Sequence, residues 1–581
     1  MKVRAFLPGL PYVNLSSVRL ANFFLLSLLL ASLCGCGFTR AQTGQNGSPA
    51  PAQPATAPVS AASTQPAAFH HTVKRGESIP TVVREYISHT SYMTGAELES
   101  ALREVNNKPN GNNLKPGEDL IIPGYESAPI VEHSVPVPKD FEVRAIYLTG
   151  TMAGSDHGIR IIRRWRELGG NAVVFDIKDS DGSVNVVFDH PLAPKAKHHS
   201  IANLPKLIRF LHSENMHAIA RIALFRDEHI ARTYPELAVQ SKRALASVAQ
   251  NKVAQGKAAP AKAAENITTE NQAAQNLTVQ NQTVQNQTVQ NQAVQSQVAQ
   301  DSTVGQQNQP AQNPGAQNQV AQSVVQNNDA QSKTTQSKIT PGKTASQPWR
   351  ENGKLVWSDP SNPRVQDYDL ALAKFVASSG ADEIQFDYVR FPAEGDQKDA
   401  QFAFMKSHPE WQRADVIADF LSRAYSELHP SGVLLSLDVF GVMAWQRSVD
   451  LNHTGQDITR MAKFCDVLSP MIYPSHFFGM DGYKRPGDAP EHFISTSMQR
   501  FEKVTQGSGV VLRPWLQAFA WRTPTYSPQY IETQVKVAKN NGGVGFLFWN
   551  ARNDYGRPFA AMPDMTHKMD EYFKTVAAKK S

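Results

Sequence analysis

The chain has 581 residues, of which 41% are hydrophobic and 19% charged, with a formal net charge of +6. A net charge this small, without an arginine-rich stripe, argues against nucleic acid as a partner. Three cysteines are too few for a disulfide framework. Residues 240–348 consist mainly of Gln, Asn, Ala, Val, Ser and Thr, so fewer domains are expected than the roughly four that the length suggests.

The first 36 residues have the arrangement of a bacterial export signal. A short apolar run covers residues 21–33, less than the roughly 20 residues of a membrane-spanning helix. It ends in LCGC at residues 33–36, which resembles a bacterial lipobox and implies that Cys36 is lipidated and becomes the mature N-terminus. The alternative is ordinary cleavage near Ala41, which gives a soluble periplasmic or secreted protein. We therefore expect an exported protein of the cell envelope, held to the membrane through its lipid.

A tether and a small module come next. Residues 37–69 are rich in Pro, Ala and Ser without hydrophobic periodicity, which predicts an extended tether. Residues 70–125 begin with HTVKRGESI and end with NLKPGEDLIIPG, and helical spacing over 79–86 and 96–105 predicts a βααβ plan. These end motifs resemble the LysM domain, which implies binding of N-acetylglucosamine-containing glycans such as peptidoglycan. The inserted SHTSYMTG leaves a second interpretation open, a spacer or docking unit.

The body, residues 139–575, alternates apolar β-rich runs with amphipathic stretches. In PRVQDYDLALAKFVASSG the apolar spacing is helical, with Asn362 as the predicted N-cap and Pro363 at the first helical position. Near-continuous apolar strands that alternate with helices indicate a buried parallel sheet. Eight such units predict a (β/α)8 TIM barrel of the α/β class. An open doubly wound sheet is the alternative, weakened because no glycine-rich loop follows the first strand. The predicted strands are residues 143–149, 172–177, 218–224, 383–388, 433–438, 467–473, 510–517 and 545–549.

Polar and aromatic side chains follow several of these strands. In a barrel, the carboxyl ends of the strands share one rim, where active sites lie. Carboxylates together with indole rings suit a sugar, whose hydroxyls bond to polar groups while its apolar faces stack on aromatic rings. The sequence therefore predicts a glycan cleft at this rim. The predicted substrate-binding residues are Tyr388, Arg390, Trp445, Tyr473, His476, Gln517, Trp521, Trp549 and Asn550.

Four of these segments resemble a known family. IQFDYVRFP, LSLDVFG, SPMIYPSHF and FLFWNARNDY are similar to a bacterial TIM-barrel family of glycoside-hydrolase type, often classed only as a domain of unknown function. FDYVRFP is the most specific of these motifs. The resemblance covers roughly residues 140–575 apart from the insertion, and it implies the barrel and a glycan substrate without assigning a mechanism.

Glycoside hydrolysis usually requires two carboxylic acids, one of them protonated. Asp387 and Asp438 end adjacent predicted strands and are the first candidates, with Asp176 as the third member or as the true partner of Asp387. Two carboxylates close together raise the pKa of one of them. Strand adjacency favours the short spacing of a retaining enzyme. We expect no cofactor and no metal, because no His or Cys spacing resembles a metal site.

Two rim residues have open interpretations. Arg390 either orients a catalytic carboxylate or forms a salt bridge that holds the rim. His476 either binds substrate or is a hydrogen-bonded loop residue. The sequence alone does not separate these alternatives.

The segment 240–348 interrupts the barrel. Residues 276–300 form a degenerate five-residue repeat rich in Gln, Asn and Val. Such a composition buries too little apolar surface to offset the entropy of ordering, so we expect disorder, and a β-solenoid is the weaker alternative.

Taken together, these features predict an exported, envelope-anchored glycoside hydrolase that acts on a cell-wall or extracellular polysaccharide by carboxylate acid/base chemistry. The alternative function is a non-catalytic glycan-binding or scaffolding lipoprotein. The expected partners are a polysaccharide substrate, peptidoglycan through the LysM-like module, and the membrane through the lipid.

Overall fold

The computed structural model describes residues 68–109, 111, 114–256 and 346–574. The predicted export signal, Cys36, the tether and most of the predicted disordered insertion lie outside these residues. None of the helices in the described ranges is both long and apolar enough to cross a membrane.

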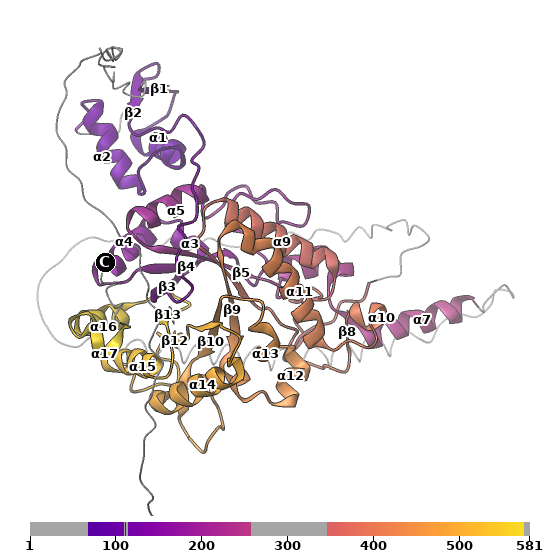
Figure 1. The fold of residues 1–581 in the computed structure, drawn as a ribbon. Coiled ribbons are helices and arrows are strands. Elements are labelled where there is room, and N and C mark those ends of the chain that lie inside the picture. Colours follow the sequence, from indigo (N-terminus) through magenta and orange to yellow (C-terminus); the bar gives the residue numbers. More distant parts are fainter. Residues whose placement is uncertain (1–67, 110, 112–113, 257–345, 575–581) are drawn as a thin grey trace, which may run out of the picture. The chain divides into compact units, whose positions relative to one another are not determined.

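Eight parallel strand positions close into a barrel (Figure 1). Each strand pairs with the next along the chain, β13 pairs with β3, and the β9–β10 pairing completes the ring. The seventh position is split at Pro514, which has no N–H to donate to the ladder. The predicted (β/α)8 barrel is confirmed. Its strands are β3 (Val143–Leu148), β4 (Ala172–Lys178), β5 (His217–Ala223), β7 (Glu383–Asp387), β9 (Leu434–Phe440), β10 (Val467–Ile472), β11 (Val511–Leu512) with β12 (Trp515–Gln517), and β13 (Gly545–Trp549).

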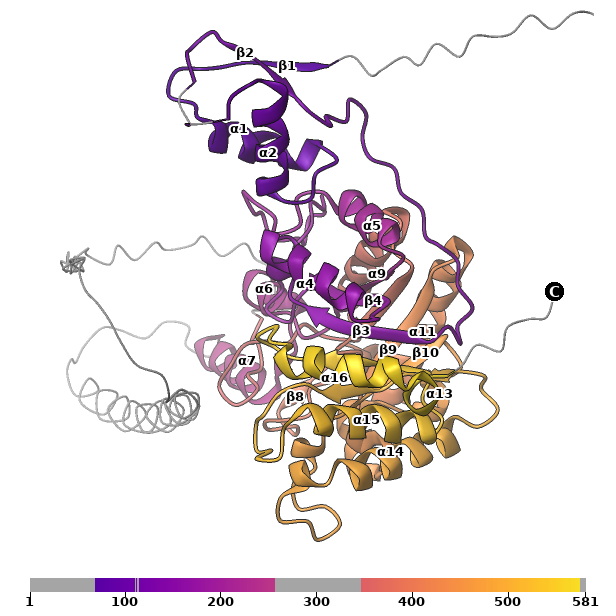
Figure 2. The same cartoon turned by 90° about the vertical axis from the view of Figure 1, so that its left-hand side faces the viewer.

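Helices surround the strands, and Figure 2 shows α14, α15 and α16 side by side on the outside of the barrel. As predicted, α9 is capped by the Asn362 side chain, which accepts a hydrogen bond from Arg364 N, and begins at Pro363. The barrel's helices are α3 (Gly150–Ala153), α4 (Asp156–Glu167), α5 (Leu204–Ser213), α6 (Glu228–Thr233), α7 (Lys242–Gly256), α9 (Pro363–Ser378), α10 (Phe404–Ser407), α11 (Arg413–Leu428), α12 (Ser448–Thr454), α13 (Ile458–Met461), α14 (Pro490–Thr505), α15 (Pro528–Asn540), α16 (Gly556–His567) and α17 (Met569–Tyr572).

Side chains alternate between two cores along each barrel strand, because successive strand residues point to opposite faces. Outward residues such as Phe386 and Leu437 pack against the helices. Inward residues such as Ala145, Val174 and Ile219 fill the barrel interior. A residue two or four positions along a strand from an interior residue therefore also points into the barrel. This alternation decides which side chains at the ends of the strands point toward the rim.

The amino-terminal end of the barrel interior holds a buried charge cluster. Arg513 Nη1 donates to both carboxylate oxygens of Glu383, at 2.8 and 2.9 Å, and His217 Nε2 lies 3.1 Å from Glu383. Burial alone would raise the pKa of Glu383, but the Arg513 charge and the His217 bond lower it to about 2. This cluster lies at the opposite end of the strands from the predicted rim, so we assign it to the stability of the barrel.

Residues 69–125 form the predicted βααβ arrangement. β1 (Phe69–Thr72) pairs antiparallel with β2 (Asp119–Ile122), and α1 (Ile79–Tyr86) and α2 (Gly95–Val105) lie between them in the chain. Side chains from both helices and β2, including Val82, Leu98 and Leu120, form a separate small core. The βααβ plan is confirmed, whereas its glycan-binding function stays a prediction.

The predicted disorder is wrong at the start of the insertion. β6 (Gln240–Ser241) pairs antiparallel with β8 (Ala400–Gln401), and α7 continues from it. Asp399 explains this order, because its carboxylate accepts hydrogen bonds from Ser241 Oγ and Arg243 N, each at 2.8 Å. A composition-based prediction does not detect such an anchor from a distant loop.

Candidate active site

The carboxyl ends of four neighbouring strands place three aspartates around one arginine. Asp176 is on β4, Arg221 on β5, Asp387 on β7 and Asp438 on β9. Each lies an even step from an interior residue of its strand, so all four point inward. The register pairs Phe386 with Leu437, so Asp387 and Asp438, the next residues, are neighbours across two strands.

Arg221 connects the three carboxylates. Its Nη2 and Nε donate to Oδ2 of Asp387 at 2.6 and 3.2 Å, and its Nη1 donates to Asp176. Its Nε also lies 3.9 Å from Oδ2 of Asp438. One buried cation thus faces three buried acids, so the acids cannot all be fully compensated as anions.

This imbalance changes the protonation of the acids. Burial and the neighbouring charge of Asp387 raise the pKa of Asp438 well above its usual range, and Arg221 and the hydrogen bond from Trp515 Nε1, 2.7 Å long, offset only part of the rise. Burial also raises the pKa of Asp176 to about 6, although Arg221 opposes it. The site therefore sets Asp438, whose proton is held more tightly than that of an ordinary aspartate, beside Asp387, which is in contact with a guanidinium.

Aromatic rings hold this cluster in place. Tyr147 OH donates to Asp176, and the Tyr147 ring stacks on Trp549 with centroids 4.1 Å apart. Trp515 stands perpendicular to Trp549 at 5.6 Å. The guanidinium of Arg221 lies 5.3 Å from the Trp549 ring centre, within cation–π range. The rings thus restrict Arg221 as well as forming an apolar wall.

The backbone turns sharply directly after Asp387. Tyr388 has φ of 53°, in the left-handed region that a bulky residue rarely adopts. Its N–H donates to Asp387 Oδ1 at 2.6 Å. Such a conformation costs about 1–3 kcal/mol and is concentrated at functional sites. Here it fixes the orientation of the Asp387 carboxylate and turns the Tyr388 ring toward the rim.

A cavity of about 300 Å³ opens over this cluster, at the lower end of the roughly 300–1,000 Å³ usual for small-molecule sites. It combines carboxylates, guanidinium groups and aromatic faces, a lining that suits a sugar. Within the described ranges, no group of three or more His, Cys, Asp or Glu side chains could hold a metal ion. The lining residues are Tyr147, Thr149, Asp179, Ser180, Arg221, Asp387, Tyr388, Arg390, Asp438, Phe440, Met471, Tyr473, Trp515, Trp549 and Ala551.

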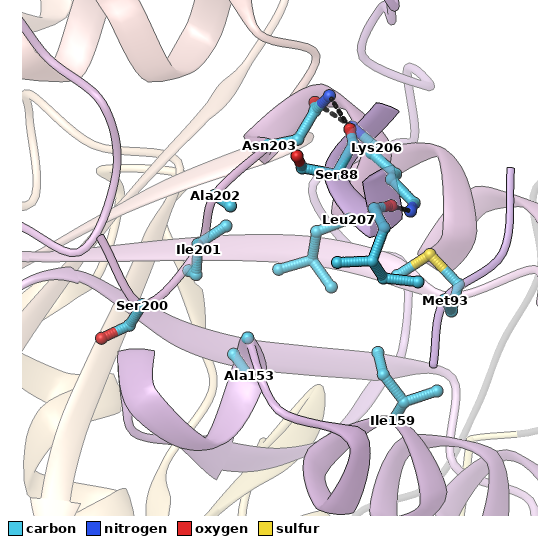
Figure 3. Close-up of a pocket in the computed structure, with 12 residues that line it drawn as sticks. Ser88, Met93, Ala153, Ile159, Ser200, Ile201, Ala202, Asn203, Lys206 and Leu207 are labelled. Atoms are coloured by element: carbon cyan, nitrogen blue, oxygen red, sulfur yellow. Dashed lines mark hydrogen bonds between the residues drawn. The ribbon is translucent and has the colours of Figure 1, made fainter. Parts of the chain in front are cut away.

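Figure 3 shows a second, smaller cavity of about 100 Å³. Asn203 Nδ2 donates to Ser88 O at 3.0 Å at its edge, and Lys206 Nζ donates to Ile87 O. Its other lining residues are small or apolar, such as Ala153 and Leu207, and none is a carboxylate. This cavity therefore has no acid/base pair. The barrel cavity is the candidate active site because it lies over Asp387 and Asp438 at the carboxyl ends of the strands.

The structure brings several of the predicted residues together. Asp387, Asp438, Tyr388, Arg390, Tyr473 and Trp549 all line the barrel cavity. Asp176 lies beneath it, fully buried and bonded to Tyr147 and Arg221. Position alone does not establish a catalytic function, so the functions of these residues remain predictions.

Five other predicted residues do not line the cavity. Gln517 is fully buried and uses its amide for Ser475 N, Phe519 O and Thr523, and Asn550 bonds to the backbone of Ala518 and Asp554, so both hold loops. Trp445 packs on Phe477, with Arg500 over its ring. His476 and Trp521 contact each other, with ring centres 4.9 Å apart. Burial lowers the pKa of His476, and its bond to Ser475 Oγ matches the predicted loop alternative.

Neither of the two carboxylate contacts considered for Arg390, orienting a catalytic carboxylate or forming a salt bridge, is observed, whereas its substrate-binding function stays a prediction. Among the described residues, its guanidinium donates to the backbone oxygen of Phe391 and to no carboxylate. The arginine that orients the carboxylates is Arg221, which the sequence analysis missed, together with Tyr147 and Trp515. A signal was present: in HAIARIA, the single charged side chain lies at an interior position of an otherwise apolar strand.

Comparison with known proteins identifies a family, and three solved structures of low sequence identity are described below. The profile of the family described as "Putative glycosyl hydrolase domain" matches residues 145–276 and 318–555. Comparison with curated proteins returns no match. Similar solved structures include a hypothetical protein from Ruminiclostridium thermocellum (24% identity, TM-score 0.29, 51% of this chain and 97% of that chain) and the PgaB (BpsB) glycoside hydrolase domain from Bordetella bronchiseptica (12%, 0.42, 74% and 99%). A third is the Bacillus cereus spore cortex-lytic enzyme SleL (10%, 0.34, 87% and 86%). At these TM-scores the likenesses say nothing about the function of this chain.

Proposed function

Because the chain belongs to the family described as "Putative glycosyl hydrolase domain", we propose that its barrel hydrolyses glycosidic bonds in a cell-wall or extracellular polysaccharide by carboxylate acid/base chemistry. The family supplies the reaction class, and the cavity over Asp387 and Asp438 supplies the site.

The observation that carries this proposal is the pairing of two unlike carboxyl groups on adjacent strands. Asp387 contacts the guanidinium of Arg221, whereas burial and the charge of Asp387 raise the pKa of Asp438. Both line the same cavity. A glycosidase needs two carboxyl groups in different environments, one that serves as the proton donor and one that serves as nucleophile or base.

Asp438 is the proposed acid and Asp387 the proposed nucleophile or base. In the retaining course, Asp387 attacks the anomeric carbon as Asp438 gives its proton to the departing glycosidic oxygen. Water then cleaves the glycosyl ester, and Asp438 takes back a proton. Arg221 and Tyr147 act as positioning residues, and Asp176 belongs to that supporting set because it does not line the cavity.

The spacing supports retention. Arg221 Nε lies 3.2 Å from Oδ2 of Asp387 and 3.9 Å from Oδ2 of Asp438. The distance between these two oxygens therefore cannot exceed the sum of those two distances. That limit includes the roughly 5–5.5 Å of retaining enzymes and only the lower edge of the roughly 6.5–9.5 Å of inverting enzymes.

The remainder of the chain would deliver the enzyme to its substrate. In this proposal, Cys36 carries a lipid that anchors the exported protein, residues 37–69 act as the tether, and the LysM-like module of residues 70–125 binds peptidoglycan. The βααβ arrangement of that module supports the assignment.

A non-catalytic glycan-binding lipoprotein is the second candidate. It is favoured by the burial of Asp438, which is 1% exposed and already bonded to Trp515. In this alternative the aspartates and Arg221 only stabilise the rim, and the cavity binds sugar without turnover.

One experiment separates the two. The full chain is incubated with purified peptidoglycan and a panel of polysaccharides, and reducing ends and pelleted protein are both measured. Release of reducing ends from one polymer supports the hydrolase. Co-sedimentation without release from any polymer supports the binding protein.

A further inference from the structure

Arg390 is a buried cation that forms no ion pair with a described carboxylate, although the charges of Asp387 and Glu351 act on it from farther away. Its side chain lines the active-site cavity and is only 8% exposed. Its one hydrogen bond within those residues runs from Nη1 to Phe391 O at 3.0 Å. A guanidinium carries five N–H groups, so most of the donors of Arg390 are unused.

The unused donors face the cavity. Arg513, in the barrel interior, has unpartnered Nε and Nη2 atoms that are sealed from solvent, whereas no atom of Arg390 is both sealed and unpartnered. A ligand in the cavity can therefore reach the Arg390 donors.

Aromatic rings fix the guanidinium in this position. Its carbon lies 4.3 Å from the ring centre of Phe440, 4.9 Å from Trp357 and 5.3 Å from Tyr388. Contacts with ring faces hold a cation without neutralising it. Arg390 is thus oriented in advance while its charge stays available.

A second arginine strengthens the positive charge. Arg226 lies 5.6 Å from the centre of the same Tyr388 ring and donates to Ser180 Oγ, on the cavity lining, at 2.9 Å. No described carboxylate forms an ion pair with Arg226 or Arg390. Arg221, the other arginine of the cavity lining, is paired with Asp176 and Asp387.

The acids nearby are engaged elsewhere. Asp387 contacts Arg221, and Glu351 accepts a hydrogen bond from Trp357 Nε1 at 2.9 Å. Asp179, also on the lining, accepts from Ser180 N at 2.6 Å. None of these three carboxylates forms an ion pair with Arg390, so its guanidinium donors stay available at the cavity.

We propose that Arg390, with Arg226 beside it, forms a subsite for a carboxylate carried by the sugar, so that the preferred substrate is an acidic glycan. A guanidinium fork matches a carboxylate with two parallel hydrogen bonds. The proposal rests on the proposed function only for the identity of the cavity as a glycan site. The carboxylate could belong to a uronic acid or to the lactyl group of muramic acid.

The test measures binding of matched sugars to the full chain. Glucuronate is compared with glucose, and N-acetylmuramate with N-acetylglucosamine, because within each pair the acidic sugar supplies the added carboxylate. We expect at least one acidic sugar to bind about tenfold or more tightly than its neutral partner, with a preference that weakens as salt is added. The pair that shows the preference identifies the source of the carboxylate.

Three variants identify the cause. Arg390→Gln should bring the acidic sugar to the affinity of its neutral partner. Arg500→Gln is the matched control, because Arg500 also lies over an indole ring, that of Trp445, but outside the cavity lining, and it should keep the preference. If Arg390→Gln does not fold, Arg390→Lys replaces it, since it keeps the charge but loses the fork, and should weaken binding of the acidic sugar alone.

The inference is overturned if neither acidic sugar binds better than its partner, or if folded Arg390→Gln keeps the preference. With Arg390→Lys as the test, wild-type affinity for the acidic sugar overturns it. Binding needs no turnover, so an inactive barrel that prefers acidic sugars would refute the proposed hydrolase and leave this inference standing. Hydrolysis of a neutral polymer without any preference for acidic sugars would support the proposed hydrolase and refute this inference.

Discussion

Arg221 contacts or approaches all three candidate carboxylates and is 3% exposed. Replacement by Gln leaves Asp176 and Asp387 buried without their cation, which typically costs about 3–5 kcal/mol of unfolding free energy. We expect Arg221→Gln to lower stability by this order and to raise the pKa of Asp176 further, because Arg221 opposes that rise. Chemical denaturation measures the loss.

Arg164→Gln provides the comparison for this variant. Arg164 pairs with Glu167 at the surface of α4, where both side chains are more than half exposed, so its loss should leave the denaturation midpoint unchanged. Equal midpoints for Arg221→Gln and wild type would contradict the central position of Arg221.

Asp176 should make stability depend on pH. Burial raises its pKa to about 6, so between about pH 4 and pH 6 the folded protein holds a proton that the unfolded chain releases. Stability from this group is therefore present below about pH 4 and is lost as pH rises through 6, on the order of 2–3 kcal/mol. Asp359, whose burial raises its pKa to about 6, acts in the same direction.

Unfolding free energies measured from pH 4 to 7 test this sign. Asp176→Asn should show a smaller decline than wild type, and Asp564→Asn, at an exposed position of α16, should match wild type. An unchanged decline in Asp176→Asn would show that Asp176 does not hold the proton.

At the level of secondary-structure elements, the two ends of the insertion lie next to each other, because β6 at its start is hydrogen-bonded to Gln347 at its end. Ser241 N donates to Gln347 O at 2.6 Å, and Gln347 N donates to Gln240 Oε1 at 2.7 Å. A short linker in place of residues 245–345 can therefore join these ends. Because the cost of loop length is only logarithmic, we expect a cooperative thermal transition within a few degrees of wild type.

A longer excision, of residues 240–345, tests the anchor itself. It removes β6 and the Ser241–Asp399 bond, so its melting temperature should be lower than that of the shorter excision. Loss of the cooperative transition in the shorter excision would show that the segment is needed for folding.

The strands and their ends could be predicted from the sequence because a buried strand is a near-continuous run of apolar residues. All eight predicted positions occur, and the aspartates meet because an even step inside a strand preserves its face. Trp445 and Trp521 were misplaced because both lie in connections after strands, Trp445 at the end of a short 3-10 helix, and the course of these connections depends on contacts such as that of Trp445 with Phe477. Arg221 is marked in the sequence as the single charge of the apolar strand HAIARIA, but its partners, Asp176 and Asp387, come from other strands and meet it only when the barrel closes.

For the whole molecule, we propose a lipid anchor at Cys36, which would determine where the barrel works. If Cys36 of the LCGC segment is the lipidated residue, Cys36→Ser should move the protein from the membrane fraction to the soluble fraction. Cys34→Ser is the matched control, since Cys34 leaves with the signal in this proposal, and it should stay with the membrane. Retention of Cys36→Ser in the membrane fraction would refute the anchor.

The central claim, a barrel that cleaves glycans with Asp387 and Asp438, is tested most directly by the rate at which Asp387→Asn releases reducing ends from the polymer that the wild type cleaves. The amide matches the acid in size but cannot ionise, so we predict a loss of about 10²–10⁴-fold in a variant that still folds and melts cooperatively. The Asp564→Asn protein should keep the wild-type rate. Cleavage by folded Asp387→Asn at close to the wild-type rate would contradict the account.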